Sequence, residues 1–190
     1  VTFVSFNDTL SNNANEQNTM SLGGLDMNMT VHIDDAVRLR ANLTTDGSKY
    51  VELQGGGDLN MLYTPQGDMS LTGRYTLSGG TMKYSLPVIP LKEFTFQQGS
   101  YVDWRGDIMN PRLSLTASER VRASVSDGDN SSRRADFDVS VSIKNSLEAP
   151  DLSFDLSAPN DGNIQNELQS MSTDERSKAA ITMLATGMYM

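Results

Sequence analysis

Residues 25–33, LDMNMTVHI, alternate apolar and polar side chains along the whole stretch. Because successive side chains of a strand point to opposite faces of a sheet, this alternation places Leu25, Met27 and Met29 on one face and His32 on the other. A strand of this kind has one apolar face that must be covered. The same period of two recurs along nearly the whole chain, which predicts a mainly β fold.

Turn-forming residues separate the alternating segments. Asp46-Gly47 predicts a type I′ hairpin, TPQGD at 64–68 a tight turn, and DGDNSS at 127–132 a longer hairpin. Glycines at 55–57 follow one predicted strand, and glycines at 79–80 precede another. Turns spaced by roughly ten to twelve residues are typical of a meander of short antiparallel strands, and we expect about ten of them.

The period changes to a helical one near the C-terminus. In STDERSKAAITMLATG at 172–187, Ser172 and Glu175 have the spacing of a capping box, and Gly187 supplies a stop. A shorter helical piece is expected around IQNELQSM at 164–171. We therefore expect one or two short helices within 160–187 of a single domain spanning 1–190, whose segment 1–24 has no assigned structure.

Two short helices cannot cover about ten strands, so the sheet has to cover itself. One architecture is a many-stranded antiparallel sheet bent into a taco-like trough, whose aliphatic lining can take a ligand; the alternative is a closed β-sandwich. The expected lining is the apolar-face set: Leu59, Met61, Tyr63, Met69, Leu71, Tyr75, Leu77, Met82, Tyr84, Phe94, Phe96, Trp104, Leu113, Leu115, Val121, Phe137, Val139, Val141, Ile143, Leu152, Phe154 and Leu156. Its methionines adapt to irregular partners, although core filling is the simpler explanation of them.

The composition disfavours several function classes. A net charge of −9 repels phosphate backbones, so we expect no nucleic-acid partner. The absence of cysteine excludes thiol nucleophiles, thiolate metal sites and disulfides, and it leaves the compartment open. His32 is the only histidine and lies on a polar strand face, so we expect no catalytic residues, no metal site and no cofactor. The calcium-like DGDN at 127–130 lacks the remaining ligand spacing and is interpreted as a turn.

Residues 94–117, FTFQQGSYVDWRGDIMNPRLSLTA, contain the only tryptophan. Small polar residues, glycine and proline follow it, a composition that turns a backbone rather than one that builds a catalytic loop. We expect a structural corner formed by Gly106, Asp107, Asn110 and Pro111, with Trp104 anchoring the strand before it.

Three motifs carry a resemblance to a known family. They are W-x-G-D-x-x-N-P at 104–111, L-x-x-P-x-L-x-F-D-L-x-x-P at 147–159, and S-x-x-E-R at 172–176. From about residue 94 onward the chain resembles the C-terminal domain of the TamB family, the translocation and assembly module component related to AsmA-like, bridge-like lipid-transfer proteins. Upstream, only the glycine-punctuated strand pattern supports the resemblance.

This resemblance implies a periplasmic module of a protein anchored in the inner membrane and reaching the outer membrane. It implies roles in phospholipid transport and outer-membrane assembly, with a hydrophobic groove that shields acyl chains or apolar strands. The implied partners are a phospholipid or another acyl chain and an outer-membrane barrel of the TamA/BamA type. Since the chain starts at Val1, we expect the membrane anchor to lie outside this stretch.

Two further function classes fit the composition. One is a non-catalytic docking scaffold that offers a strand edge to an outer-membrane barrel. The other is a glycan-binding or adhesin β-sandwich, which would be expected to expose an aromatic platform. Both predict that no lipid is bound.

Overall fold

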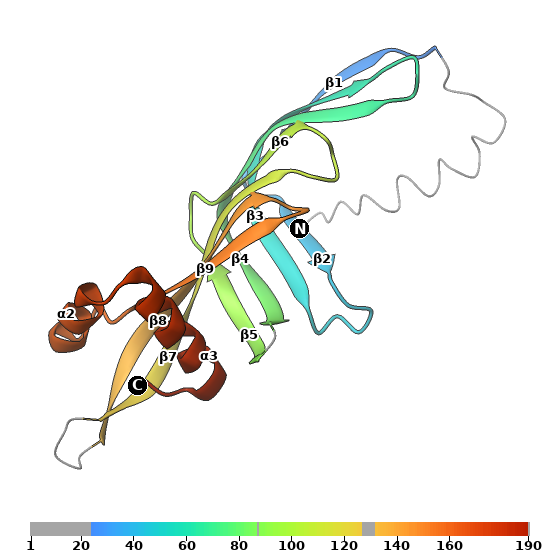
Figure 1. Ribbon diagram of the computed structural model, residues 1–190. Coiled ribbons are helices and arrows are strands. Elements are labelled where there is room, and N and C mark those ends of the chain that lie inside the picture. The colour runs from blue at the N-terminus through green and yellow to red at the C-terminus, as the bar shows by residue number, and fades with distance from the viewer. Residues whose placement is uncertain (1–23, 87, 127–131, 190) are drawn as a thin grey trace.

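The computed structural model describes residues 24–86, 88–126 and 132–189. These residues form one antiparallel sheet of nine strands followed by two helices (Figure 1). The strands are β1 (Met27–Ile33), β2 (Arg38–Asn42), β3 (Tyr50–Tyr63), β4 (Met69–Leu86), β5 (Ile89–Phe96), β6 (Tyr101–Gly106), β7 (Arg112–Ser126), β8 (Ser132–Ser146) and β9 (Pro150–Ser157), and the helices are α2 (Gly162–Ser170) and α3 (Thr173–Thr186). The predicted mainly β, antiparallel fold with two C-terminal helices is confirmed.

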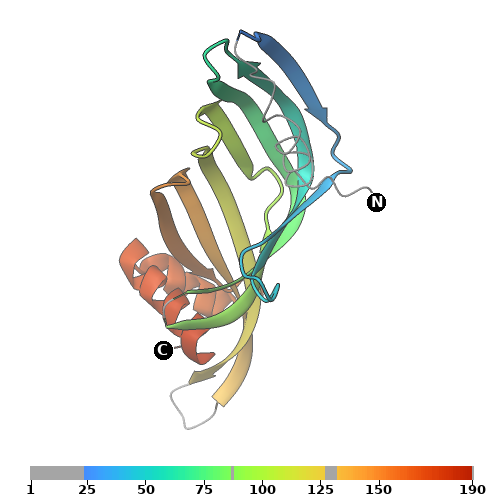
Figure 2. The same cartoon turned by 90° about the vertical axis from the view of Figure 1, so that its right-hand side faces the viewer.

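Most strands of the sheet follow one path, and two short strands pair beside it. The main path runs β1-β3-β4-β5-β7-β8-β9; β2 also pairs with β3, and β6 pairs with both β4 and β7. The described strands therefore make a single open sheet rather than the two sheets of a sandwich. Figure 2 shows this sheet strongly curved, with both helices against one side of it.

The strands between 50 and 86 are longer than the turn spacing predicts. The glycines at 55–57 and 79–80 lie inside β3 and β4, not between strands. Gly73 in β4 has a φ of 126°, and a Cβ there would lie 2.3 Å from the carbonyl oxygen of Asp58. The register also shifts between Gln54 and Gly55. Glycine therefore bends two long strands here instead of ending them.

Another long strand lies further along the chain. Leu113, Leu115 and the apolar set at 121–125 belong to one continuous strand, β7. No turn residue interrupts the alternation between them, so β7 pairs with β8 over its full length. Nine strands replace the expected ten in the described part of the chain.

The predicted turns have mixed outcomes. The hairpin between β2 and β3 is confirmed, but its type I′ assignment is wrong, because the connection is longer and closes with a 2.8 Å bond from Leu43 N to Lys49 O. Asp46 is instead an acceptor inside this loop, for Thr44 and Ser48. The turn at 64–68 is confirmed. Residues 127–131 of the hairpin predicted at 127–132, with the calcium-like sequence at 127–130, lie outside the described residues.

The helices begin and end where their capping residues predict. Ser172 accepts a bond from Glu175 N, and the Glu175 side chain accepts one from Ser172 N, which completes the capping box. Gly187 ends α3 with a φ of 72°. Helix α3 packs on β9 and also contacts β5, β7 and β8, so the main core lies between this helix and the C-terminal part of the sheet.

Candidate functional site: the apolar face of the sheet

The strand register places all the residues predicted as groove lining on one face. Met29 of β1 lies opposite Met61 of β3, which lies opposite Leu71 of β4. At the other end of the sheet, Val139 of β8 lies opposite Leu156 of β9. Since directly paired residues project to the same side, the apolar face runs without a break from β1 to β9.

One part of this face is covered by protein, and we call it the covered half. It includes Phe137 and Val139, both with no exposed surface, which share a core cluster with Ala180, Met183 and Leu184 of α3. The ring of Tyr189, beyond α3, lies 5.0 Å from that of Phe137. Further members are Tyr75, Leu77, Phe94, Phe96, Leu115, Val141 and Leu156.

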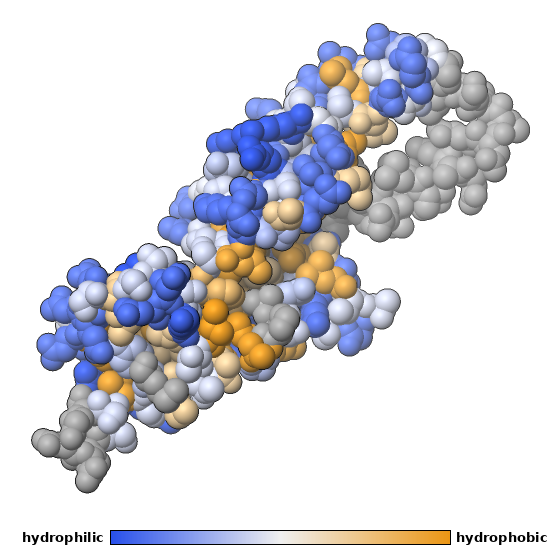
Figure 3. Space-filling model, viewed as in Figure 1, coloured by the Kyte–Doolittle hydropathy of each residue, from blue (hydrophilic) through white to orange (hydrophobic). Residues whose placement is uncertain are grey.

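The rest of the same face is exposed in whole or in part, except for the buried Leu59, and we call it the open half. Met69 is 45% exposed and Met29 is 38% exposed, although both occupy apolar positions of the alternation. Further members are Met27, Met61, Tyr63, Leu71, Trp104, Leu113, Ile143 and Leu152. The space-filling view shows apolar side chains gathered beside the helices, around the ends of β4 and β5, with polar and apolar side chains mixed towards β1 (Figure 3). The exposed apolar positions of the open half can hold an apolar ligand against the sheet.

Strands β5 and β7 separate inside the covered half, since Phe94 of β5 and Leu115 of β7 both belong to it, and we call this place the border. These strands pair only at Thr95 with Ser118 and at Phe96 with Ala117. Figure 1 shows the ends of β4 and β5 diverging from β7 and β8, with α3 close to the divergence. Strands β4 and β5 on one side and β7 and β8 on the other thus form the walls of the covered half.

A carboxylate that the sequence analysis overlooked lies at this border. Glu119 is opposite Val139 and therefore projects from the apolar face. Its Oε2 is buried without a hydrogen-bond partner among the described residues. Burial raises the pKa of Glu119, with a further upward contribution from Glu93 and an opposing one from Lys92. The alternation Ala117, Glu119, Val121 was a signal that could have found it.

The predicted corner after β6 is held by local hydrogen bonds. Trp104 Nε1 donates to the carbonyl oxygen of Ile108 over 3.0 Å. Asp107 Oδ1 accepts from Met109 N over 3.0 Å, and Gly106 has a φ of 132°. The side chain of Trp104 is therefore hydrogen-bonded to the turn that follows β6.

A second set of bonds ties this corner to the turn between β8 and β9. Asn110 Oδ1 accepts from Glu148 N over 2.9 Å, and Asn110 Nδ2 donates to Glu148 Oε2 over 3.3 Å. The carbonyl oxygen of Pro111 accepts from Leu147 N over 2.9 Å. The corner residues thus join two neighbouring turns.

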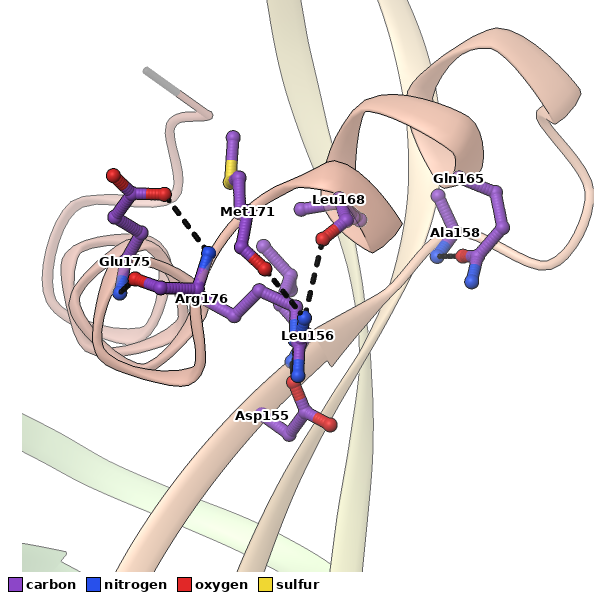
Figure 4. A network of polar contacts seen from close by, with 9 residues as sticks. Asp155, Leu156, Ala158, Gln165, Leu168, Met171, Glu175 and Arg176 are labelled. Atoms are coloured by element: carbon purple, nitrogen blue, oxygen red, sulfur yellow. Dashed lines mark hydrogen bonds and ion pairs between the residues drawn. The ribbon is translucent and has the colours of Figure 1, made fainter.

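An arginine fastens the helices to the sheet (Figure 4). Arg176 Nε donates to Asp155 Oδ1 of β9 over 2.9 Å. Its Nη1 donates to the carbonyl oxygens of Met171 over 2.9 Å and of Leu168 over 3.4 Å, at the end of α2. Two residues from separate sequence motifs, Asp155 and Arg176, therefore meet in one contact.

The remaining charged candidates lie outside the apolar face. His32 is exposed and pairs with Asp58 at 2.6 Å, and this hydrogen bond raises the pKa of His32. Arg120 and Asp138 form an exposed cross-strand pair. Among the described residues, His, Asp and Glu side chains do not gather in groups of three or more that could hold a metal ion.

Two shallow hollows, of about 230 and 250 Å³, also lie outside this face. Both are lined by Ser114 and Lys144, which project to the side opposite Leu113 and Leu115. Their lining is mostly polar, although Leu113 of the open half reaches the second. The apolar face extends across many strands, whereas each hollow involves only a few residues, so we take the apolar face as the candidate site.

Comparison with protein families matches residues 2–188 to the TamB C-terminal domain. A search among curated proteins finds no match. Within the described residues, neither helix has the length and apolar character needed to cross a bilayer.

Proposed function

This chain belongs to the TamB C-terminal domain family, and we propose that its open half shields phospholipid acyl chains during transport between the envelope membranes. Membership supports a role in the translocation and assembly module. The observation that carries the proposal is the apolar face, which extends across the sheet from β1 to β9 but is covered over only part of its extent. An uncovered apolar surface of this extent calls for an apolar occupant.

The energetic reason is the cost of exposing a lipid chain to water. Moving a sixteen-carbon chain from an apolar environment into water costs on the order of 13 kcal/mol, at about 0.8 kcal/mol per methylene. A strip of methionine and leucine side chains removes most of that cost, because flexible thioethers fit acyl chains of different shape. In this proposal the module works in the periplasm, and the inner-membrane anchor belongs to another part of the protein.

Photocrosslinking with native mass spectrometry tests the proposal directly. Photoreactive residues at Met61 and Leu71 on the open half should capture co-purified phospholipid, whereas one at Thr72, on the opposite face of β4, should not. Equal capture at Thr72, or a lipid-free protein without crosslinks, would contradict the proposal.

Adjacent residues on opposite faces supply a matched pair of variants. Met61→Asp places a charge in the open half, and Leu62→Asp places one at a 41%-exposed position on the other face. We expect only Met61→Asp to reduce phospholipid binding, by roughly tenfold or more, because a charge opposes burial of an acyl chain. Equal losses would indicate a general effect on the sheet.

A docking scaffold is the second candidate, favoured by the free edges of the sheet. In the described chain, β1 pairs only with β3, and β9 pairs only with β8. Such edges expose backbone groups that can accept a strand from an outer-membrane barrel of the TamA/BamA type. Proline at Thr30 or Ser153 should then weaken barrel binding and leave lipid capture at Met61 unchanged.

A further inference from the structure

Four methionines gather at one place in the open half, and we call them the methionine cluster: Met27, Met29, Met61 and Met69. Met61 lies directly opposite Met29. Met27 and Met69 both lie opposite Tyr63, two residues along β3 from Met61. Direct and diagonal neighbours on one sheet face are within reach of long side chains, so the four thioethers surround one patch of the lining.

This cluster differs from the methionine of the covered half in its access to solvent. Met29 and Met69 are 38% and 45% exposed, whereas Met183 of α3 has no exposed surface. Met109 and Met188 are also exposed, at 80% and 46%, but they lie outside the strands and so outside the lining. The chain has no cysteine, so its thioethers are the sulfur atoms that an oxidant can reach. Oxidation of methionine follows exposure, and it converts a flexible apolar side chain into a polar, chiral one.

We propose that the methionine cluster is an oxidation site, at which hypochlorous acid or a related two-electron oxidant makes the lining of the open half polar. In the net reaction the thioether sulfur takes the oxygen of hypochlorous acid. An S–O bond forms, the O–Cl bond breaks, and chloride and a proton leave into water. Sulfur is oxidised by two electrons and chlorine is reduced by two.

The location of the cluster separates the change in the lining from the packing of the core. Sulfoxide oxygens at these positions project into the part of the apolar face that has no helix over it, while the core under α3 keeps its packing. The loss of acyl-chain binding that follows rests on the proposed function; the preferential oxidation does not. Methionine sulfoxide is reduced by two stereospecific reductases, so the change is reversible.

Peptide mass spectrometry after graded hypochlorous acid treatment tests the site itself. We expect sulfoxide at the four cluster positions to form roughly tenfold faster than at Met183, with the unfolding transition unchanged. Oxidation of Met183 at the same rate, or loss of the fold at the dose that oxidises the cluster, would overturn the proposal.

Binding of a photoreactive fatty acid, before and after oxidation, tests the consequence. We expect roughly a tenfold loss of affinity in the natural sequence, recovered after treatment with both reductases. The matched variant M27L/M29L/M61L/M69L keeps the apolar volume and the other methionines, and its affinity should change less than twofold. If that variant does not fold, recovery by the reductases remains the deciding measurement.

The outcomes separate this inference from the proposed function. An untreated protein that binds no fatty acid contradicts the acyl-chain function. The oxidation rates of the individual methionines then decide alone whether the cluster is an oxidation site. A protein that binds fatty acid equally well before and after complete oxidation of the cluster contradicts the proposed effect of oxidation on binding, but it does not contradict the acyl-chain function.

Discussion

The covered and open halves share one sheet, one register and one pattern of alternation, yet they differ in burial. Phe137 lies beneath α3 with no exposed surface, whereas Met61, at an equivalent apolar position of β3, is only partly buried. The strand sequence therefore selects the face, and the presence of a covering element decides whether that face becomes core. The covered half stabilises the fold, and the open half is left for a ligand.

Truncation of Phe137 should produce the largest difference between the halves. Phe137→Ala removes a fully buried ring that contacts Tyr189, and we expect a loss of about 3–5 kcal/mol in the free energy of unfolding. Met61→Ala, the matched change in the open half, should cost less than about 1.5 kcal/mol because little cavity forms. Urea unfolding of both variants measures the difference, and equal losses would show that the open half is also core.

Arg176 joins α2 and α3 to β9, and we call its set of hydrogen bonds the clamp. Breaking the clamp should have the next largest effect. Arg176→Gln leaves the carbonyl oxygens of Leu168 and Met171 without their charged donor, and we expect a loss of about 1–3 kcal/mol. Hydrogen exchange should rise in α2 and α3 ahead of the sheet, because the clamp joins these helices to β9.

Arg120→Gln is the control for that measurement. Arg120 makes a similar pair with Asp138 on an exposed strand face, where such pairs contribute about 0–1 kcal/mol. Exchange in the helices should stay unchanged. An effect of Arg120→Gln as large as that of Arg176→Gln would contradict the assignment of the clamp as the link between helices and sheet.

The face of each strand could be predicted from the sequence because period two is a local property. The capping box of α3 was predictable for the same reason, since Ser172 and Glu175 lie within one helical turn. The apolar stripe of α3 indicated that the helix is amphipathic, but it did not indicate which strands it covers. That choice depends on the divergence of β5 from β7, which is a property of the assembled sheet.

Glycine caused the main error in the strand assignments. In a local pattern, glycine marks a turn, so the segments around 55–57 and 79–80 were expected to end strands. In the sheet, Gly73 and Gly80 take positive φ values at places where a Cβ would meet the neighbouring backbone. The requirement is for close approach between two long strands, which involves residues far apart in the sequence.

The tryptophan corner tests whether part of the open half is structural. Trp104→Phe keeps an aromatic ring but loses the hydrogen bond to the carbonyl oxygen of Ile108, and we expect a loss of about 0.5–1.5 kcal/mol. Tyr84→Phe, at an exposed ring on the same face, should change thermal stability by less than about 0.5 kcal/mol. A Trp104→Phe protein with full thermal stability would count against an anchoring role.

Glu119 gives the smallest expected effect, and it probes the border where β5 and β7 separate. Because its pKa is raised in the folded protein, the fold favours the protonated carboxyl, and stability falls as the pH rises through the unfolded-state pKa towards the folded-state value. Glu119→Gln removes this cost. We expect the variant to be slightly more stable than the natural sequence at pH 7, with the gain disappearing below about pH 4, where glutamate is protonated in both states. Urea unfolding at pH 7 and pH 3 measures it, and a variant that is less stable at pH 7 would show that the ionised carboxylate has a partner at the border.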